Sequence, residues 1–249
     1  MLGKLSGKTA LVTGASSGIG EATALQLAAE GALVAIAARR ADRLEALAAR
    51  IETLGGKALP LVGDVCIEED ARRMVEALTA SAGRIDILVN NAGVMLLGPI
   101  LHADTEDWRR MVNTNVLGLL YCTHAALPHM AEAKSGHIVN ISSVAGRTAR
   151  AGAAVYNATK WGVGAFSEAL RQEALAHKIR VTIIEPGLVA TELRDHITHQ
   201  ESKQSINAWA ESLTQLTSED IAASVVYAVT QPWHVNVNEI LIRPTEQLG

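Results

Sequence analysis

Short apolar segments alternate with helix-like segments along almost the whole chain. The apolar segments, such as those at 9–13 and 33–37, are continuous runs. Continuous runs are typical of strands in a parallel sheet that is covered on both faces, whereas a half-exposed strand alternates apolar and polar residues. Repeated strand–helix units of this kind form a doubly wound sheet. The sequence therefore predicts an α/β fold.

The boundaries of the expected elements follow from these segments. Strands are expected at 9–13, 33–37, 58–62, 85–89, 137–141, 180–184 and 239–242, and helices at 19–30, 41–54, 68–82, 105–131 and 153–177. No linker or internal repeat interrupts the series. Residues 1–249 are therefore predicted to form a single doubly wound (Rossmann) domain with a parallel sheet of about seven strands.

Composition and charge restrict the function classes. Apolar residues make up 49% of the chain, enough for a sizeable core, and the net charge is −4. The absence of a Lys/Arg cluster argues against nucleic acid as a partner, and the longest apolar stretch, 32–38, is too short to span a bilayer. The chain starts with a strand-like run, so no signal peptide is expected. Cys66 and Cys122 are expected as free thiols in a reducing cytoplasm, with a disulfide as the alternative.

The segment TGASSGIG at 13–20 joins the first strand to the first helix. Glycines at such a turn let the backbone approach a pyrophosphate, which binds at the helix N-terminus. The residues expected to make this contact are Gly14, Ser16, Ser17, Gly18, Ile19 and Gly20. A plain strand–helix turn is the alternative.

The same segment matches a second motif. Gly14-x-Ser16-x-Gly18 has the pattern of the nucleophile elbow of serine hydrolases, which also lies between a strand and a helix. An elbow after the first strand has no earlier strand–helix loop to supply the second oxyanion donor. It also leaves Tyr156 and Lys160 unexplained, so a dinucleotide site is the preferred interpretation.

Tyr156 and Lys160 are four residues apart on an expected helix, so their side chains lie on one face. The ammonium is expected to lower the pKa of the phenol from its usual value of about 10. Such a tyrosine can exchange a proton with a carbonyl or alcohol oxygen, and the Ser143 hydroxyl can hydrogen-bond the same oxygen. In isolation the pair is typical of a helix surface, and only the surrounding motifs favour catalysis.

The end of the second expected strand indicates the cofactor. An acidic residue there binds the adenine ribose and selects NAD, but this strand leads into Ala38, Arg39 and Arg40. A guanidinium pairs with the 2′-phosphate of NADP through charge-assisted hydrogen bonds, and Ala38 leaves room for it. The sequence predicts NADP(H), with Arg39 as the main phosphate ligand. Arg40 is either a second ligand or a solvated helix-start residue.

Several motifs occur in order along the chain: TGxxxGxG at 13–20, NNAG at 90–93, Asn115, Ser143, Tyr156-x-x-x-Lys160 and Pro186-Gly187-x-x-x-Thr191. In this combination the chain resembles the short-chain dehydrogenase/reductase family from about residue 6 to residue 244. Within the family, the segments 192–194, 196–199 and 242–244 are most similar to clavulanate dehydrogenase-like members.

The resemblance implies a role for each motif. Tyr156 would be the general acid in carbonyl reduction, and Lys160 would lower its pKa and hydrogen-bond the nicotinamide ribose. Ser143 would hold the substrate oxygen, and Asn115 would bind a water that relays protons towards Lys160. The remaining cofactor contacts would come from Asp64, Val65, Asn91, Ala92, Gly93, Pro186, Gly187 and Thr191.

The substrate is expected to be an aldehyde or ketone, or the corresponding alcohol. Its pocket is expected around Met95, at 144–155 and in a loop at about 188–216. Arg147 and Arg150 lie close to Ser143 in the sequence, so either could hold a substrate carboxylate. Solvated or intersubunit positions are the alternative for both arginines. A 3-oxoacyl thioester substrate and a non-catalytic NADP-sensing function also remain open, although a sensor needs no complete catalytic set.

The helices expected at 105–131 and 153–177 are unusually apolar for surface helices. The resemblance implies that they form a four-helix dimer interface, so a homotetramer, or a homodimer, is expected. His196 and His199 have no third ligand nearby, so they are read as part of a solvated loop and no metal site is expected.

Overall fold

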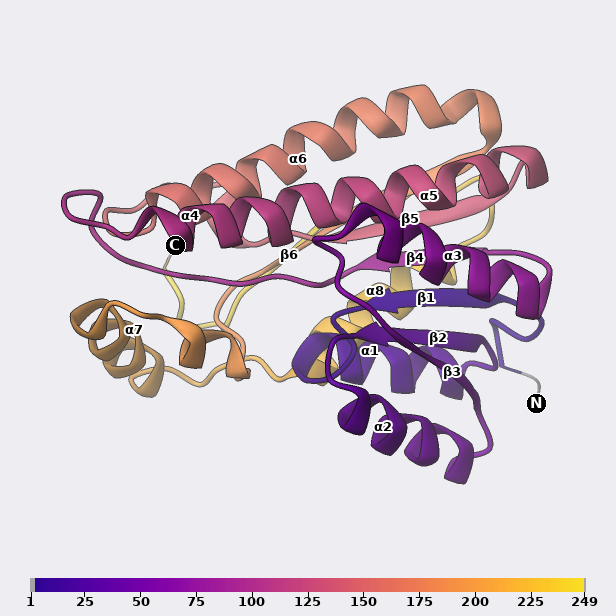
Figure 1. Ribbon diagram of the computed structural model, residues 1–249, viewed down its shortest axis with the longest axis horizontal. Helices are drawn as coiled ribbons and strands as arrows, with labels where there is room; N and C mark the ends of the chain where they lie inside the picture. Colours follow the sequence, from indigo (N-terminus) through magenta and orange to yellow (C-terminus); the bar gives the residue numbers. More distant parts are fainter. Residues whose placement is uncertain (1–2, 249) are drawn as a thin grey trace.

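The protein, a computed structural model, is described over residues 3–248. Its centre is a seven-stranded sheet in the order β3-β2-β1-β4-β5-β6-β7, and every strand pair is parallel (Figure 1). The strands are β1 (Thr9–Thr13), β2 (Leu33–Ala38), β3 (Lys57–Val62), β4 (Ile87–Asn90), β5 (Gly136–Ile141), β6 (Ile179–Pro186) and β7 (Glu239–Ile242). The predicted doubly wound α/β fold is confirmed.

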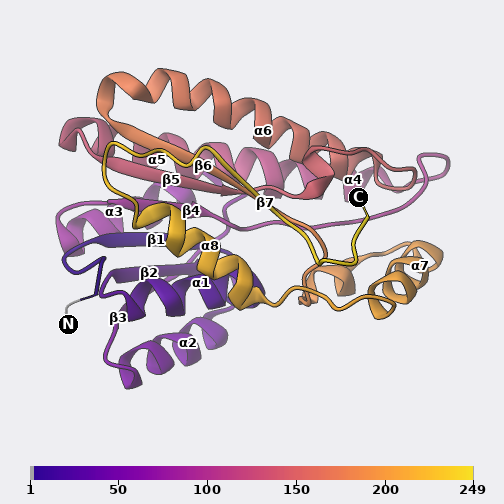
Figure 2. The ribbon, with the colours of Figure 1, turned by 180° about the vertical axis from the view of Figure 1, so that it is seen from behind.

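Helices cover both faces of the sheet, which explains why its central strands, such as β1, β2 and β4, are largely apolar and buried. One face packs against α1 (Gly18–Ala29), α2 (Ala41–Thr53) and α8 (Ser218–Val229). The other packs against α3 (Glu68–Ala82), α5 (Gly118–Ala133) and α6 (Ala154–Ala174) (Figures 1 and 2). Leu11 and Val12, neighbours in β1, are both fully buried in opposite layers.

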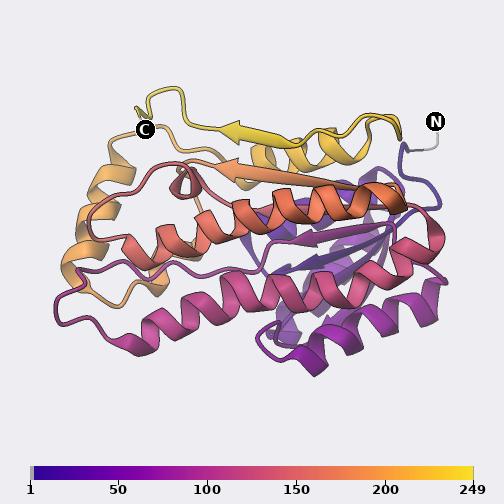
Figure 3. The same ribbon diagram turned by 90° about the horizontal axis from the view of Figure 1, so that it is seen from above.

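The strand order changes direction at β1, because β2 lies on one side of it and β4 on the other. In doubly wound sheets, ligands bind at such a point, in the crevice outside the carboxyl ends of the strands. All strand arrows point towards the end of the molecule where α7 (Gln200–Glu211) lies (Figure 3). The loops that follow β1, β4, β5 and β6 therefore meet at this end.

The helix predicted at 105–131 is interrupted. α4 (Thr105–Val112) and α5 are joined by a π-helical turn, Asn113–Leu117. Within this turn, the buried side chain of Asn115 is bonded to Val94 and Thr159, which belong to other segments. π-helical turns inside helices occur frequently at functional sites. Apolar periodicity does not reveal such a turn, because the helix continues on both sides of it.

The segment predicted as a loop at 188–216 contains α7. His199, predicted in a solvated loop, is the N-cap of this helix, and its Nδ1 accepts a hydrogen bond from Ser202 N. α7 buries only Ala210, so its sequence carries little apolar signal. α8 was not predicted, although a capping box of Thr217 and Asp220 marks its start.

Candidate active site

The turn between β1 and α1 brings two strand ends close together. Gly14 and Gly18 have positive φ angles of 65° and 59°. A Cβ on Gly14 would lie 2.8 Å from Ala92 Cα, and one on Gly20 would lie 2.3 Å from Gly14 O, so larger residues do not fit. The Ser17 side chain makes no capping bond at the start of α1. The first N–H groups of this helix are therefore available to an anion.

A cavity of about 950 Å³ runs from this turn along the carboxyl ends of the strands to α7. Most residues predicted from the sequence line it. They are Gly14, Ser16, Ser17, Gly18, Ile19, Ala38, Arg39, Arg40, Asp64, Val65, Asn91, Ala92, Gly93, Met95, Ser143, Arg150, Tyr156, Lys160, Pro186, Gly187 and Thr191. Gly20, Asn115 and Arg147 lie outside the lining.

The two arginines after β2 differ in position. Arg40 Nη2 donates to Ser16 Oγ and Ser17 Oγ, both at 2.8 Å, and its Nη1 donates to Glu192 at 3.1 Å. The side chain of Arg39 is 72% exposed, and it lies 3.7 Å from Asp64. The sequence left two alternatives for Arg40. In the structure its guanidinium is bonded to the serines of the glycine turn.

The position of Arg40 also argues against the serine hydrolase alternative. Ser16 Oγ accepts hydrogen bonds from both Nε and Nη2 of Arg40. A guanidinium has no acceptor and stays protonated, so it cannot take a proton from a serine nucleophile. Ser16 is therefore suited to binding rather than to attack.

Ser143, Tyr156 and Lys160 lie together on one wall of the cavity. Tyr156 and Lys160 are one turn apart in α6, with Lys160 Nζ 5.8 Å from the centroid of the tyrosine ring. Ser143 is the N-cap of the short 3₁₀ turn Val144–Gly146 that follows β5. Its Oγ accepts from Ala145 N at 3.1 Å and donates to Pro186 O at 3.5 Å.

Burial determines the protonation of the pair. It raises the pKa of Tyr156 to about 12, which a hydrogen bond with Ser143 offsets in part. It lowers the pKa of Lys160 to about 8. The net shift of the Tyr156 pKa is therefore opposite to the predicted direction, because loss of water around the phenol dominates. At neutral pH the phenol keeps its proton, as a general acid requires.

Asn115 is hydrogen-bonded to Thr159, the residue that precedes Lys160 in α6. Its Oδ1 accepts from Val94 N at 2.8 Å, and its Nδ2 donates to Val94 O at 2.9 Å and to Thr159 Oγ1 at 3.1 Å. A Cβ on Gly93 would lie 3.3 Å from Asn115 Oδ1 and 3.9 Å from Lys160 Nζ. Gly93 thus allows the loop after β4 to pass between these two side chains.

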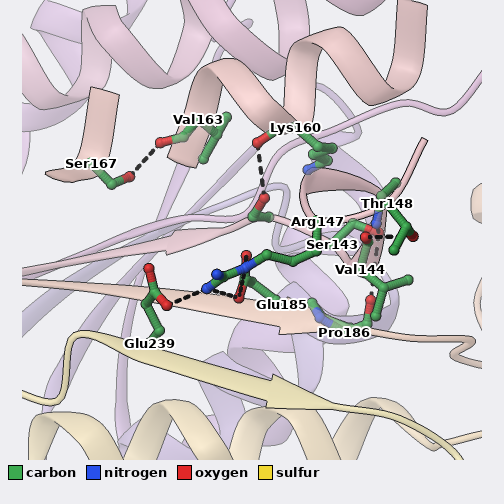
Figure 4. Close-up of polar contacts among 12 residues, drawn as sticks. Ser143, Val144, Arg147, Thr148, Lys160, Val163, Ser167, Glu185, Pro186 and Glu239 are labelled. Atoms are coloured by element: carbon green, nitrogen blue, oxygen red, sulfur yellow. Dashed lines mark hydrogen bonds and ion pairs between the residues drawn. The ribbon is translucent and has the colours of Figure 1, made fainter. Parts of the chain in front are cut away.

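The two arginines predicted for the substrate point in different directions. The Arg147 guanidinium binds the buried carboxylate of Glu185 at 2.7–2.9 Å and also bonds to Glu239 (Figure 4). Because two carboxylates bind it and it lies outside the cavity lining, Arg147 is not available to a substrate. Arg150 lines the cavity, with its guanidinium carbon 5.7 Å from the centroid of the Trp209 ring.

The sequence analysis assigned no role in the site to Asn157, Glu192 or Trp209. Asn157 donates to Ala145 O and Thr148 O and accepts from the backbone N–H of Arg150, so it fixes the segment after Ser143 to α6. Glu192 bridges Arg40 and Arg43. Asn157 could have been predicted as a site residue, because it is adjacent to Tyr156 in the sequence. The position of Trp209 could not, because it depends on how α7 packs.

Across residues 3–248, no helix is long and apolar enough to cross a membrane. The same residues contain no cluster of three or more His, Cys, Asp or Glu side chains that could hold a metal ion. Cys66 and Cys122 are free thiols, and burial raises the pKa of Cys122 to about 12.

Sequence comparisons identify the family. The model of the family described as short chain dehydrogenase matches residues 8–202. An uncharacterized oxidoreductase of Staphylococcus saprophyticus is 40% identical over 243 residues, which cover 96% of this chain and 97% of the relative. Glycine betaine reductase of Emericella nidulans is 42% identical over 98% of this chain, but the match covers only 19% of that protein. The chain belongs to the short-chain dehydrogenase family.

Solved structures share the fold over nearly the whole chain. The closed form of a serine dehydrogenase complexed with NADP⁺ has a TM-score of 0.89 and 38% identity, and 96% of each chain is covered. A metagenomic short-chain oxidoreductase in complex with NADP has a TM-score of 0.83 and 33% identity, with 98% of this chain and 100% of that chain covered. This protein is accordingly an oxidoreductase of the short-chain family.

Proposed function

We propose that the protein is an NADP-dependent oxidoreductase that interconverts an aldehyde or ketone and the corresponding alcohol. The observation that carries the proposal is that Ser143, Tyr156 and Lys160 share one wall of a cavity that extends to the glycine turn. Similar proteins whose structures contain NADP or NADP⁺ support the choice of cofactor.

The residues that line the cavity fit a dinucleotide. The open N-terminus of α1 binds the pyrophosphate, and Arg40 with Ser16 binds the 2′-phosphate. Asp64, Val65 and the loop Asn91–Gly93 would hold the adenine and its ribose. Lys160 would bind the nicotinamide ribose, and the carboxamide would contact Pro186, Gly187 and Thr191. When bound, NADPH supplies the hydride, while the protein supplies position and proton.

In the reduction, Tyr156 donates its proton to the substrate oxygen, and Ser143 Oγ holds that oxygen by a hydrogen bond. Lys160 stabilises the phenolate that remains, because its ammonium is one helical turn away. Asn115 binds a water that relays protons towards Lys160. In the opposite direction, the phenolate takes the proton from an alcohol.

We further propose that the substrate carries a carboxylate. Arg150 lines the cavity beside Trp209 of α7. Arginine binds carboxylates through paired hydrogen bonds. One structural relative is a serine dehydrogenase, and serine has a carboxylate close to its hydroxyl.

We also propose that the protein is a homotetramer, or a homodimer, that assembles through α5 and α6. Trp161 of α6 is 52% exposed, although tryptophan side chains are highly buried on average. Light scattering on the purified protein measures the mass of the assembly.

Oxidation of NADPH by a panel of aldehydes and ketones tests the proposed function. Wild-type protein should turn over members of the panel, and Tyr156→Phe should bind NADPH without turnover. Binding of NADPH by wild-type protein without oxidation by any carbonyl compound would instead favour a nucleotide sensor.

A further inference from the structure

The ion pair between Arg147 and Glu185 joins two segments of the active site from outside the cavity. Ser143 begins the short turn Val144–Gly146, and Arg147 directly follows that turn. Glu185 directly precedes Pro186 at the end of β6. The same two segments meet a second time, because Ser142 N donates to Ile184 O at 2.7 Å and Ser143 Oγ lies 3.5 Å from Pro186 O. The position of Ser143 is therefore coupled to the end of β6.

The geometry of the ion pair suits a rigid link. Arg147 Nε lies 2.7 and 2.9 Å from the two carboxylate oxygens of Glu185, and Nη2 lies 2.8 Å from one of them. The Glu185 side chain is only 3% exposed, so water does not compete for it. Glu239 of β7 binds the same guanidinium from the edge of the sheet (Figure 4). A planar guanidinium fixes direction as well as distance, which an ammonium does not.

The opposite side of this segment is held by α6. Asn157 donates to Ala145 O and Thr148 O, both at 2.8 Å, and it is adjacent to Tyr156 in the helix. The segment that follows Ser143 is therefore attached to the catalytic helix by Asn157 and to β6 by Arg147. We expect loss of either attachment to loosen the segment after Ser143, while Ser142 stays bonded to Ile184 O and Lys160 O.

We propose that Arg147 is a positioning residue that acts through Glu185 to hold Ser143 at the correct distance from Tyr156. This inference rests on the proposed function, because it assumes that Ser143 binds the substrate oxygen. Misplacement of a reacting or binding group by about 1 Å can lower a rate on the order of 100-fold. The ion pair is thus expected to affect turnover more than cofactor binding.

Two variants remove the link in different ways. Arg147→Lys keeps the charge beside Glu185 but loses the planar fork. The double variant Arg147→Met/Glu185→Leu removes both charges, so no unpaired carboxylate remains buried. Both should lower kcat at least about tenfold and leave the Kd for NADPH, measured by fluorescence, within about twofold of wild type. Arg72→Lys is the matched control, since Arg72 also binds two carboxylates, Glu69 and Glu76, on the exposed face of α3. It should retain wild-type kcat.

Variants in a Ser143→Ala background distinguish an effect of Arg147 on the position of Ser143 from a general effect on the fold. If Arg147 acts through Ser143, the loss of kcat from Arg147→Lys and from the double variant should largely disappear in Ser143→Ala. An equal loss in both backgrounds, or no loss in either, would overturn the inference. If Ser143→Ala alone has wild-type kcat, the role of Ser143 in the proposed function fails instead.

Discussion

Lys160 in α6 donates a hydrogen bond from Nζ to the backbone oxygen of Ile141, the last residue of β5, at 2.9 Å. This bond crosses from the catalytic helix to the sheet and fixes the buried ammonium on the cavity wall. An ammonium has three N–H donors, so the others can serve the cavity. Lys160 is therefore placed by the sheet as well as by its helix.

Tyr156→Phe should abolish most of the activity without loss of the cofactor. The change removes the proton donor and keeps the ring, so kcat should fall by at least about 100-fold while the Kd for NADPH stays near the wild-type value. Tyr227→Phe is a matched control, because Tyr227 is 56% exposed on α8. Steady-state kinetics and fluorescence titration measure the two quantities. Wild-type kcat in Tyr156→Phe would contradict the mechanism.

Burial of Lys160 should make the stability of the fold depend on pH. Its pKa is lowered by burial from 10.5 to about 8, so between these values the unfolded chain binds a proton that the folded chain does not. The free energy of unfolding should therefore rise with pH in this window. The total rise is on the order of 3 kcal/mol, since one pKa unit corresponds to about 1.4 kcal/mol.

Urea unfolding of wild type and Lys160→Met between pH 7.5 and 10 measures this effect. The variant should be the more stable protein at pH 7.5, and the difference should shrink as the pH rises. Comparison of the two proteins cancels the opposite contributions of Cys122 and Tyr156, whose raised pKa values reduce stability at high pH. A difference that does not change with pH would contradict the lowered pKa.

Arg40→Ala should weaken binding of NADP(H) more than Arg39→Ala does. Arg40 is bonded to the glycine-turn serines, whereas Arg39 is mostly exposed. Loss of a hydrogen bond to a charged group costs about 1.5–3 kcal/mol, or about 10- to 150-fold in Kd. Binding of NAD(H), which lacks the 2′-phosphate, should change little in either variant. Calorimetric titration gives all the values, and an equal or larger loss of NADP(H) affinity in Arg39→Ala than in Arg40→Ala would refute the prediction.

Arg150→Ala should reduce the preference for carboxylate-bearing substrates. We expect kcat/KM for an aldehyde acid to fall by about 10- to 150-fold, the effect of one charged hydrogen bond, with little change for the matched neutral aldehyde. Arg109→Ala is the control, because Arg109 is an exposed residue of α4 paired only with Glu106. A substrate preference unchanged by Arg150→Ala would exclude this arginine as the carboxylate ligand.

The features predicted correctly are those that depend on residues close together in the sequence. A strand covered on both faces is apolar along most of its length rather than at alternate positions, so runs such as Thr9–Thr13 identify β1 and its counterparts in the sheet. A turn in which backbone segments approach closely requires glycine, so Gly14 and Gly18 mark the switch point without any knowledge of the rest of the fold.

The direction of the arginine side chains was decided only by the tertiary structure. Arg147 is drawn to Glu185, 38 residues later in the chain, and Arg40 to Glu192, 152 residues later. The π-helical turn at Asn115 and the cap of α7 likewise depend on particular side-chain hydrogen bonds rather than on apolar periodicity. A sequence pattern specifies which residues reach the same edge of the sheet. Which charges pair there follows from distances and burial that exist only after the chain has folded.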